Sequence, residues 1–270
     1  MQTLSMKAFK SAIAPLFVSA SLVLTGFAQA ETAEEKGLTI AKEQKARNVG
    51  WNDSSSEMKM ILRTANGREN TRFIKVKSLE VQGDGDKSLM VFDQPKDVQG
   101  TSFLSFSHID KPDDQWIYLP ALKRIKRISS KKKSGSFMGS EFSYEDLSSF
   151  EVEKYDFKYL RDEQLNGKDC FVIESYPKDK YSGYKRLVSW VDKADYNSQK
   201  IEFFDKRDEL LKTMTVETYE KFNEKYWRPI KSVMQNVQTG KSTTLEWNSI
   251  ALGTGLSPDD FSKNALKSSE

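Results

Sequence analysis

The chain has 270 residues, of which 42 are basic and 39 acidic. Subtracting Lys7 and Lys10, which fall in the leading segment, leaves 40 basic against 39 acidic residues. This balance argues against a generally basic protein that binds nucleic acid. The mean hydropathy of -0.64, with 11% aromatic residues, predicts a polar exterior around an aromatic-rich interior.

The first thirty residues have the organisation of a secretory signal peptide. Two lysines precede an apolar run over residues 12–27, and residues 28–30, Ala-Gln-Ala, form a small-x-small cleavage site. The run is shorter than the roughly 20 residues that span a bilayer, so we expect cleavage and not a retained anchor. Cys170 is the single cysteine, which excludes an intramolecular disulfide and lies far from the site of lipid attachment after a signal. We expect residues 31–270 to form one soluble domain in the periplasm.

The remaining pattern predicts a mainly β protein with a few helices. Helix formers over residues 32–48 precede Gly50 as a C-cap, and Ser257-Pro258 begins a short closing helix that reaches about Leu266. Between them, short apolar or alternating segments are separated by turn residues, which is typical of strands. The expected strands are 58–62, 73–81, 89–92, 101–106, 115–119, 155–160, 170–175, 186–191, 199–204, 210–219, 227–236 and 243–250.

These segments predict about eleven antiparallel strands joined mostly by sequential hairpins. A sheet of that width must twist, curl or close. We therefore expect a curled antiparallel sheet, a half-open barrel that encloses a hydrophobic cavity plugged by helices.

Several motifs resemble the outer-membrane lipoprotein-sorting protein family, the LolA-like proteins, in its branch associated with RND-type transporters. They are residues 93–101, 116–122, 127–128, 137–140, 142–147, 190–193 and 211–212. The resemblance covers essentially the whole chain after residue 30. It implies a half-open antiparallel barrel, a cavity for acyl chains and a carrier role without catalysis.

Met and aromatic side chains can line such a cavity, since thioethers adapt to chains of different shape. Glycines on either side of Phe137-Met138 would let that pair open and close over a pocket, although a well-packed loop is the alternative. The residues expected at the cavity lining or mouth are Met58, Met60, Leu62, Ile74, Leu104, Trp116, Tyr118, Phe137, Met138, Phe142, Tyr144, Trp190 and Phe203.

Residues 123–133, KRIKRISSKKK, hold seven cations and no acid. They are either a solvated strand end and loop, or a surface for anionic lipid headgroups or for an acidic patch on a transporter. Asp146 or Glu145 is expected to anchor this basic arm. The residues expected to contact a headgroup or a partner are Arg124, Arg127, Lys131, Lys132 and Lys133.

The chain offers little for catalysis or metal binding. His108 is the single histidine, and no G-x-S-x-G motif is present, so a Ser-His-Asp arrangement is not indicated. Gly240 to Thr243 resembles the end of a phosphate loop, but Gln235 stands where that motif needs glycine. We expect no enzyme activity, no cofactor and no metal.

The sequence therefore predicts a monomeric carrier of a lipid or acylated lipoprotein across the periplasm to the outer membrane, with transient membrane contact, an RND-type transporter as partner and no nucleic acid. The alternative is an accessory subunit that binds such a transporter without carrying cargo.

Overall fold

The computed structural model describes residues 1–3 and 30–267, so the predicted signal peptide lies almost wholly outside the described residues. The chain divides into two units, Met1–Ala30 and Glu31–Glu270, and the second contains every helix and strand named below. In the described part of the chain, no helix is both long and apolar enough to cross a membrane.

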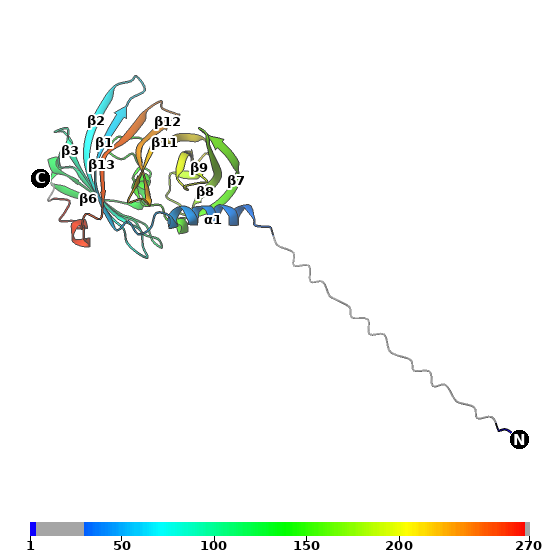
Figure 1. Cartoon of the computed structure of the whole chain (residues 1–270). Helices are drawn as coiled ribbons and strands as arrows, with labels where there is room; N and C mark the ends of the chain where they lie inside the picture. Colours follow the sequence, from blue (N-terminus) through cyan, green and yellow to red (C-terminus); the bar gives the residue numbers. More distant parts are fainter. Residues whose placement is uncertain (4–29, 268–270) are drawn as a thin grey trace. The chain divides into compact units, whose positions relative to one another are not determined.

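The second unit is built on one antiparallel sheet of thirteen strands (Figure 1). They are β1 (Asp53–Arg63), β2 (Glu69–Leu79), β3 (Lys87–Gln94), β4 (Ser102–Phe106), β5 (Asp114–Leu119), β6 (Arg124–Ile128), β7 (Tyr155–Leu165), β8 (Lys168–Pro177), β9 (Tyr184–Asp192), β10 (Ser198–Asp205), β11 (Leu210–Phe222), β12 (Tyr226–Asn236) and β13 (Ser242–Leu252). Their order is β6-β5-β4-β3-β2-β1-β13-β12-β11-β10-β9-β8-β7. The sheet curls but does not close, because β6 and β7 stand at its two opposite edges.

The predicted architecture of a curled sheet of sequential hairpins is confirmed, and the count of about eleven strands is corrected to thirteen. Twelve of the thirteen strands correspond to the twelve segments predicted above, and the additional strand is β6, where the sequence predicts a strand end and loop. Three of its five residues are cationic, so it lacks an apolar strand pattern. Such charges are common on edge strands, where they oppose pairing with another chain.

One α-helix, α1 (Ala33–Ala46), lies beside β7 and β8 (Figure 1). Thr32 and Glu35 form a capping box at its start, and its C-cap is Arg47 rather than the expected Gly50. Gly37 lets the helix approach the sheet closely, since a Cβ there would lie 2.8 Å from backbone atoms of Lys158. Ile40 and Ala41 of α1 pack with Phe157 and Ile173, two residues that also line the cavity described below, and the end of the helix contributes to that lining. Plugging of the cavity by helices stays a prediction.

The C-terminal segment covers the convex face of β4 and β5. Its helical part is a 3-10 turn, η5 (Pro258–Phe261), which is shorter than the predicted helix to Leu266. Phe261 and Leu266 are nonetheless buried, and the Ser102 hydroxyl donates a hydrogen bond to the Leu266 carbonyl at 2.7 Å. The expected anchoring of this segment by its apolar residues is confirmed.

Residues 129–154, here called the crossing segment, connect the two edges of the sheet. They contain three 3-10 turns: η2 (Ser130–Lys132), η3 (Tyr144–Leu147) and η4 (Val152–Lys154). Phe137 is fully buried and packs on Phe103 and Tyr144, with ring centroids 5.1 and 5.7 Å away. The Arg72 guanidinium on β2 donates a hydrogen bond to the Met138 carbonyl at 2.5 Å.

A buried ion pair fixes the middle of the crossing segment to β11. Lys212 Nζ lies 2.6 Å from Asp146 Oδ2 and donates a second hydrogen bond to the Glu141 carbonyl at 2.8 Å. Both charged side chains are almost fully buried. The Tyr184 hydroxyl donates to the other Asp146 oxygen at 2.8 Å, so every strong acceptor in this network has a donor. Of the two acids expected to anchor the basic arm, Asp146 binds β11 instead, whereas Glu145 lies 3.9 Å from Lys133 of that arm.

Loss of the lysine should destabilise the whole domain, because it leaves the Asp146 carboxylate buried without a cation. We expect Lys212→Met to lower the free energy of unfolding by about 3–5 kcal/mol, measured by urea unfolding. Adding Asp146→Asn should recover part of that loss. Lys241→Met, on an exposed lysine, is the control and should be near neutral. Equal effects of the two lysine substitutions would contradict the role of the ion pair.

Candidate functional site

The concave side of the sheet holds a cavity of about 860 Å³. Ten strands contribute to its lining, β1 to β3 from one half of the sheet and β7 to β13 from the other, together with the end of α1 and part of the crossing segment. This volume falls within the range of roughly 300–1,000 Å³ that is usual for small-molecule sites.

The inner part of the cavity is apolar. Met58 and Met60 of β1 and Met90 of β3 face it, with Leu245 of β13 and Phe142 of the crossing segment. All five side chains are buried. All five belong to the inner core cluster, a group of buried apolar residues that also includes Ile74, Phe92, Phe103 and Phe137.

Serine residues cover much of the remaining lining. Because strand neighbours alternate between faces, the serines share the concave face with the methionines. On β1 the inward positions run Ser54, Ser56, Met58, Met60, so the lining changes from hydroxyl to thioether along a single strand. The ten lining serines are Ser54, Ser56, Ser78, Ser88, Ser107, Ser148, Ser149, Ser175, Ser189 and Ser198.

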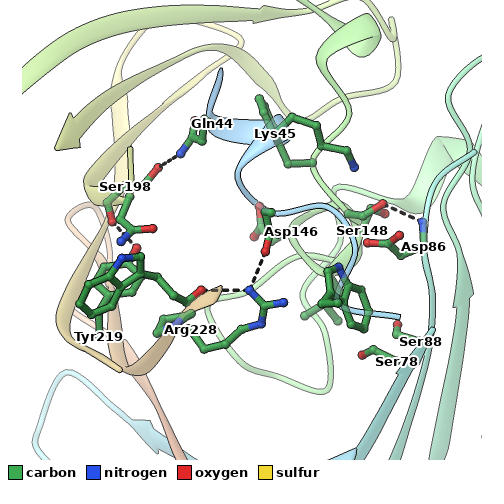
Figure 2. Close-up of a pocket in the computed structure, with 18 of the residues that line it drawn as sticks. Gln44, Lys45, Ser78, Asp86, Ser88, Asp146, Ser148, Ser198, Tyr219 and Arg228 are labelled. Carbon is green, nitrogen blue, oxygen red and sulfur yellow. Dashed lines mark hydrogen bonds between the residues drawn. The ribbon is translucent and has the colours of Figure 1, made fainter. Parts of the chain in front are cut away.

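Charged groups gather where α1 ends (Figure 2). Lys45 lies 3.0 Å from the buried Glu151 carboxylate, which holds the last turn of α1 against the crossing segment. Gln44 donates a hydrogen bond to the Ser198 hydroxyl at 2.8 Å. Arg228 of β12 donates to Asn48 Oδ1 at 2.5 Å and to the Trp227 carbonyl at 3.0 Å. Burial lowers the pKa of Arg228, and the nearby Asp86 carboxylate opposes that effect.

Asp86 is the lining acid whose protonation is most perturbed. Burial raises the pKa of its carboxyl to about 6 from an ordinary value of 3.8, against the opposing charge of Lys45. Its backbone N–H donates to the Ser149 hydroxyl at 3.2 Å, and its carboxylate accepts from the Val81 N–H at 3.4 Å.

Three of the sequence-predicted residues line the cavity directly: Met58, Met60 and Phe142. Six others belong to the inner core cluster or pack against it, on the same side of the sheet but outside the lining. These are Leu62, Ile74, Phe137, Met138, Tyr144 and Phe203. In this conformation Phe137 is a core residue, and a lid role for it stays a prediction.

The remaining four point away from the cavity. Leu104, Trp116 and Tyr118 pack under Phe261 and Leu266 on the convex face. Trp190 packs with Val172 and Val188 on the outer face of the other half of the sheet. Their strand neighbours Phe103, Ile117 and Ser189 occupy the inward positions instead. Both faces of these strands carry apolar residues, so the sequence does not indicate which face lies toward the cavity.

The predicted headgroup or partner contacts also divide. Arg127 pairs with Asp114, and Lys133 pairs with Asp179 at 2.8 Å and lies 3.9 Å from Glu145. Arg124, Lys131 and Lys132 are exposed and make no ion pair with the described residues. Lys133 therefore holds the crossing segment in place through Asp179 and Glu145. An anchoring role was expected of Glu145, whereas Lys133 was expected to contact a headgroup or a partner.

The single histidine lies apart from the cavity lining. His108 Nδ1 is 2.7 Å from Asp84 and Nε2 is 3.4 Å from Asp114. Burial would raise the pKa of Asp84, but hydrogen bonds from His108 and two backbone N–H groups hold it at about 2. Among residues 1–3 and 30–267, no three His, Cys, Asp or Glu side chains cluster as metal ligands would.

Sequence reasoning missed Arg228, Asp86 and the serines. Ser54, Ser56, Met58 and Met60 occupy every second position, so in a strand they share one face. This pattern predicts a cavity wall that changes from polar to apolar along the strand. Arg228 gave no such signal, because its approach to Asn48 depends on strands and a helix distant in sequence.

A protein-family model described as "Uncharacterized protein" matches residues 84–268. An outer membrane lipoprotein-sorting protein domain, so named, from Vibrio parahaemolyticus is 57% identical, with 87% of this chain and 99% of that chain covered and a TM-score of 0.85. A DUF1329 family protein from Desulfovibrio piger is 32% identical over the same shares, with a TM-score of 0.83. The chain belongs to the DUF1329 family.

A LolA superfamily protein from Nitrosomonas europaea shares the fold of this DUF1329 protein at 19% identity and a TM-score of 0.68, with 85% of this chain and 98% of that chain covered. No curated protein matches the sequence. The predicted resemblance to outer-membrane lipoprotein-sorting proteins is confirmed by the 57% identical relative, and the LolA-like fold is confirmed by the structure. The association with RND-type transporters stays a prediction.

The raised pKa of Asp86 makes stability depend on pH. Its native pKa lies above its unfolded value, so its contribution is fully present below about pH 4 and is lost as the pH rises through about 6. We expect Asp86→Asn to raise Tm at about pH 7.5 and to change it little near pH 4, measured by thermal unfolding. Asp110→Asn, on an exposed carboxylate, should change Tm at neither pH. A Tm gain for Asp86→Asn at the lower pH only would contradict the sign.

Proposed function

We propose that this DUF1329 protein is a periplasmic carrier that shields the acyl chains of a lipid or lipoprotein in its cavity. The observation that carries the proposal is the cavity itself, with buried methionines inside and polar groups at the end where α1 stops. The similarity to a protein named for lipoprotein sorting supports it.

The physical basis is the transfer of hydrocarbon from water. Each buried methylene contributes about 0.8 kcal/mol, so an apolar interior of this size can offset the cost of extracting a chain from a membrane. Met58, Met60 and Met90 give that interior flexible, polarizable walls that adapt to different chains.

The lining residues suit ligand binding and not catalysis. Of its three acids, Asp146 is held in the ion pair with Lys212, while Asp86 and Asp195 have no histidine or activated nucleophile beside them in the described lining. We therefore assign the site no catalytic step.

Narrowing the cavity should weaken binding. Ser56 faces its middle, and Ser56→Trp would place a ring there without removing a core side chain. Loss of space for two methylenes costs about 1.6 kcal/mol, roughly tenfold in Kd, as measured by displacement of a fluorescent acyl probe. Ser249→Trp, on an exposed position of β13, is the matched control and should bind like the parent protein.

Lipid extraction with native mass spectrometry of protein purified from its own envelope tests the proposal directly. We expect co-purifying lipid or acylated protein in the parent protein and less of it in Ser56→Trp. Consistently empty protein that also fails to bind the acyl probe would overturn the carrier function.

A second candidate function follows from the exposed cations. The cationic edge, defined as Lys123, Arg124, Lys126, Lys131 and Lys132, makes no ion pair with the described residues. It suits an acidic patch on an inner-membrane partner such as an RND-type transporter, in which case the protein is an accessory subunit without cargo.

The two functions separate in co-purification with such a transporter. An accessory subunit should keep the transporter when the cavity is narrowed by Ser56→Trp and lose it when Lys131 and Lys132 are changed to Gln. A carrier that meets its partner only when loaded should lose it in Ser56→Trp. The double variant Arg68→Gln and Lys241→Gln, at exposed positions outside the strands, controls for loss of two positive charges elsewhere.

A further inference from the structure

The cavity changes polarity in rows across the sheet. The strand register places Ser54 opposite Ser78, and Ser78 opposite Ser88. The next row, toward the interior, contains Ser56, Val76 and Met90, and the row beyond it contains Met58, Ile74 and Phe92. A ligand that matches these rows has a polar head and an apolar tail.

Arg228 lies at the serine end, near the last residues of α1 (Figure 2). Its hydrogen bonds go to Asn48, an amide oxygen, and to the Trp227 carbonyl, and no carboxylate of the described residues lies within ion-pair distance. The Asp86 and Glu80 carboxylates act on this guanidinium only at longer range. An anion in direct contact would therefore stabilise this partly desolvated group further. Its planar, forked donors suit a carboxylate or a phosphate.

The other charges at this end favour an anion as well. Lys45 and Arg47 are neutralised by Glu151 and Glu43. Of the lining groups that make no ion pair with the described residues, the cations outnumber the acids. The cations are Lys221, Lys225 and Arg228, and the acids are Asp86 and Asp195. Lys87 is not counted, because its ammonium group lies over the Phe106 ring on the convex face.

We propose that the cavity selects amphiphiles with an acidic head, a carboxylate or a phosphate, which binds at Arg228 while the hydrocarbon tail lies on Met58, Met60 and Met90. This inference rests on the carrier function proposed above and adds the chemical class and the orientation of its ligand. Hydroxyls of the serine row can hydrogen-bond ester or hydroxyl groups next to the head.

The test compares ligands of one chain length and different heads: palmitate, hexadecyl phosphate, hexadecanol and hexadecyltrimethylammonium, each below its micelle concentration. Displacement of a neutral acyl probe gives Kd for each. We expect at least one of the two acids to bind about tenfold or more tightly than the alcohol, and the ammonium compound to bind no better than the alcohol. The acid that binds more tightly identifies the head group, carboxylate or phosphate.

Variants locate the selectivity. Arg228→Gln should remove the preference for acids and leave hexadecanol binding unchanged, whereas Arg228→Lys should keep part of it. Asn48→Ala removes the acceptor but not the charge and should keep the preference, which separates an electrostatic role from a structural one. Arg68→Gln makes the same chemical change at an exposed turn and should behave like the parent protein.

The outcomes distinguish the two proposals. If no head group binds, the carrier function fails. If acid and alcohol bind equally well and Ser56→Trp weakens both, the carrier function stands and head-group selection is overturned. Selection that survives in Arg228→Gln would overturn the assignment to Arg228.

Discussion

The buried ion pair between Lys212 and Asp146 is the interaction on which the rest of the structure depends. The sheet has two free edges, so backbone hydrogen bonds alone do not hold its halves around a common space. The crossing segment joins the two edges, and this pair, with Tyr184 and the Glu141 carbonyl, fixes the segment to the far half. The partner charges are paired and hydrogen-bonded, which is the condition under which burial of charge is tolerated.

Apolar packing fixes the crossing segment to the other half of the sheet. Phe137 inserts between rings from the near half of the sheet, while Asp146 is tied to β11, so a single segment contacts both walls. Phe142 then contributes to the cavity lining. The inner end of the cavity is therefore set by the same residues that stabilise the fold.

Much of the fold could be predicted because hairpin turns and alternating residues are local signals. The Asn166-Gly167 hairpin is an example, since both residues adopt positive φ as a two-residue turn requires. Strand β6 could not be predicted because its residues are mostly charged and show no apolar alternation. The length of the closing helix was overestimated because an N-cap at Ser257 indicates where a helix begins but not where it ends. The site was less predictable: Leu104 and Trp116 sit in strands with two apolar faces, and Arg228 meets Asn48 only through tertiary structure.

The gap between β6 and β7 has a mechanical consequence. A closed barrel can expand only by breaking hydrogen bonds between strands. A sheet with an open seam, here the gap between β6 and β7, can widen at that gap while the hydrogen bonds between all of its strands stay intact. Such opening would strain the contacts that the crossing segment and α1 make with the sheet. The width of the space on the concave side is therefore not fixed by strand pairing.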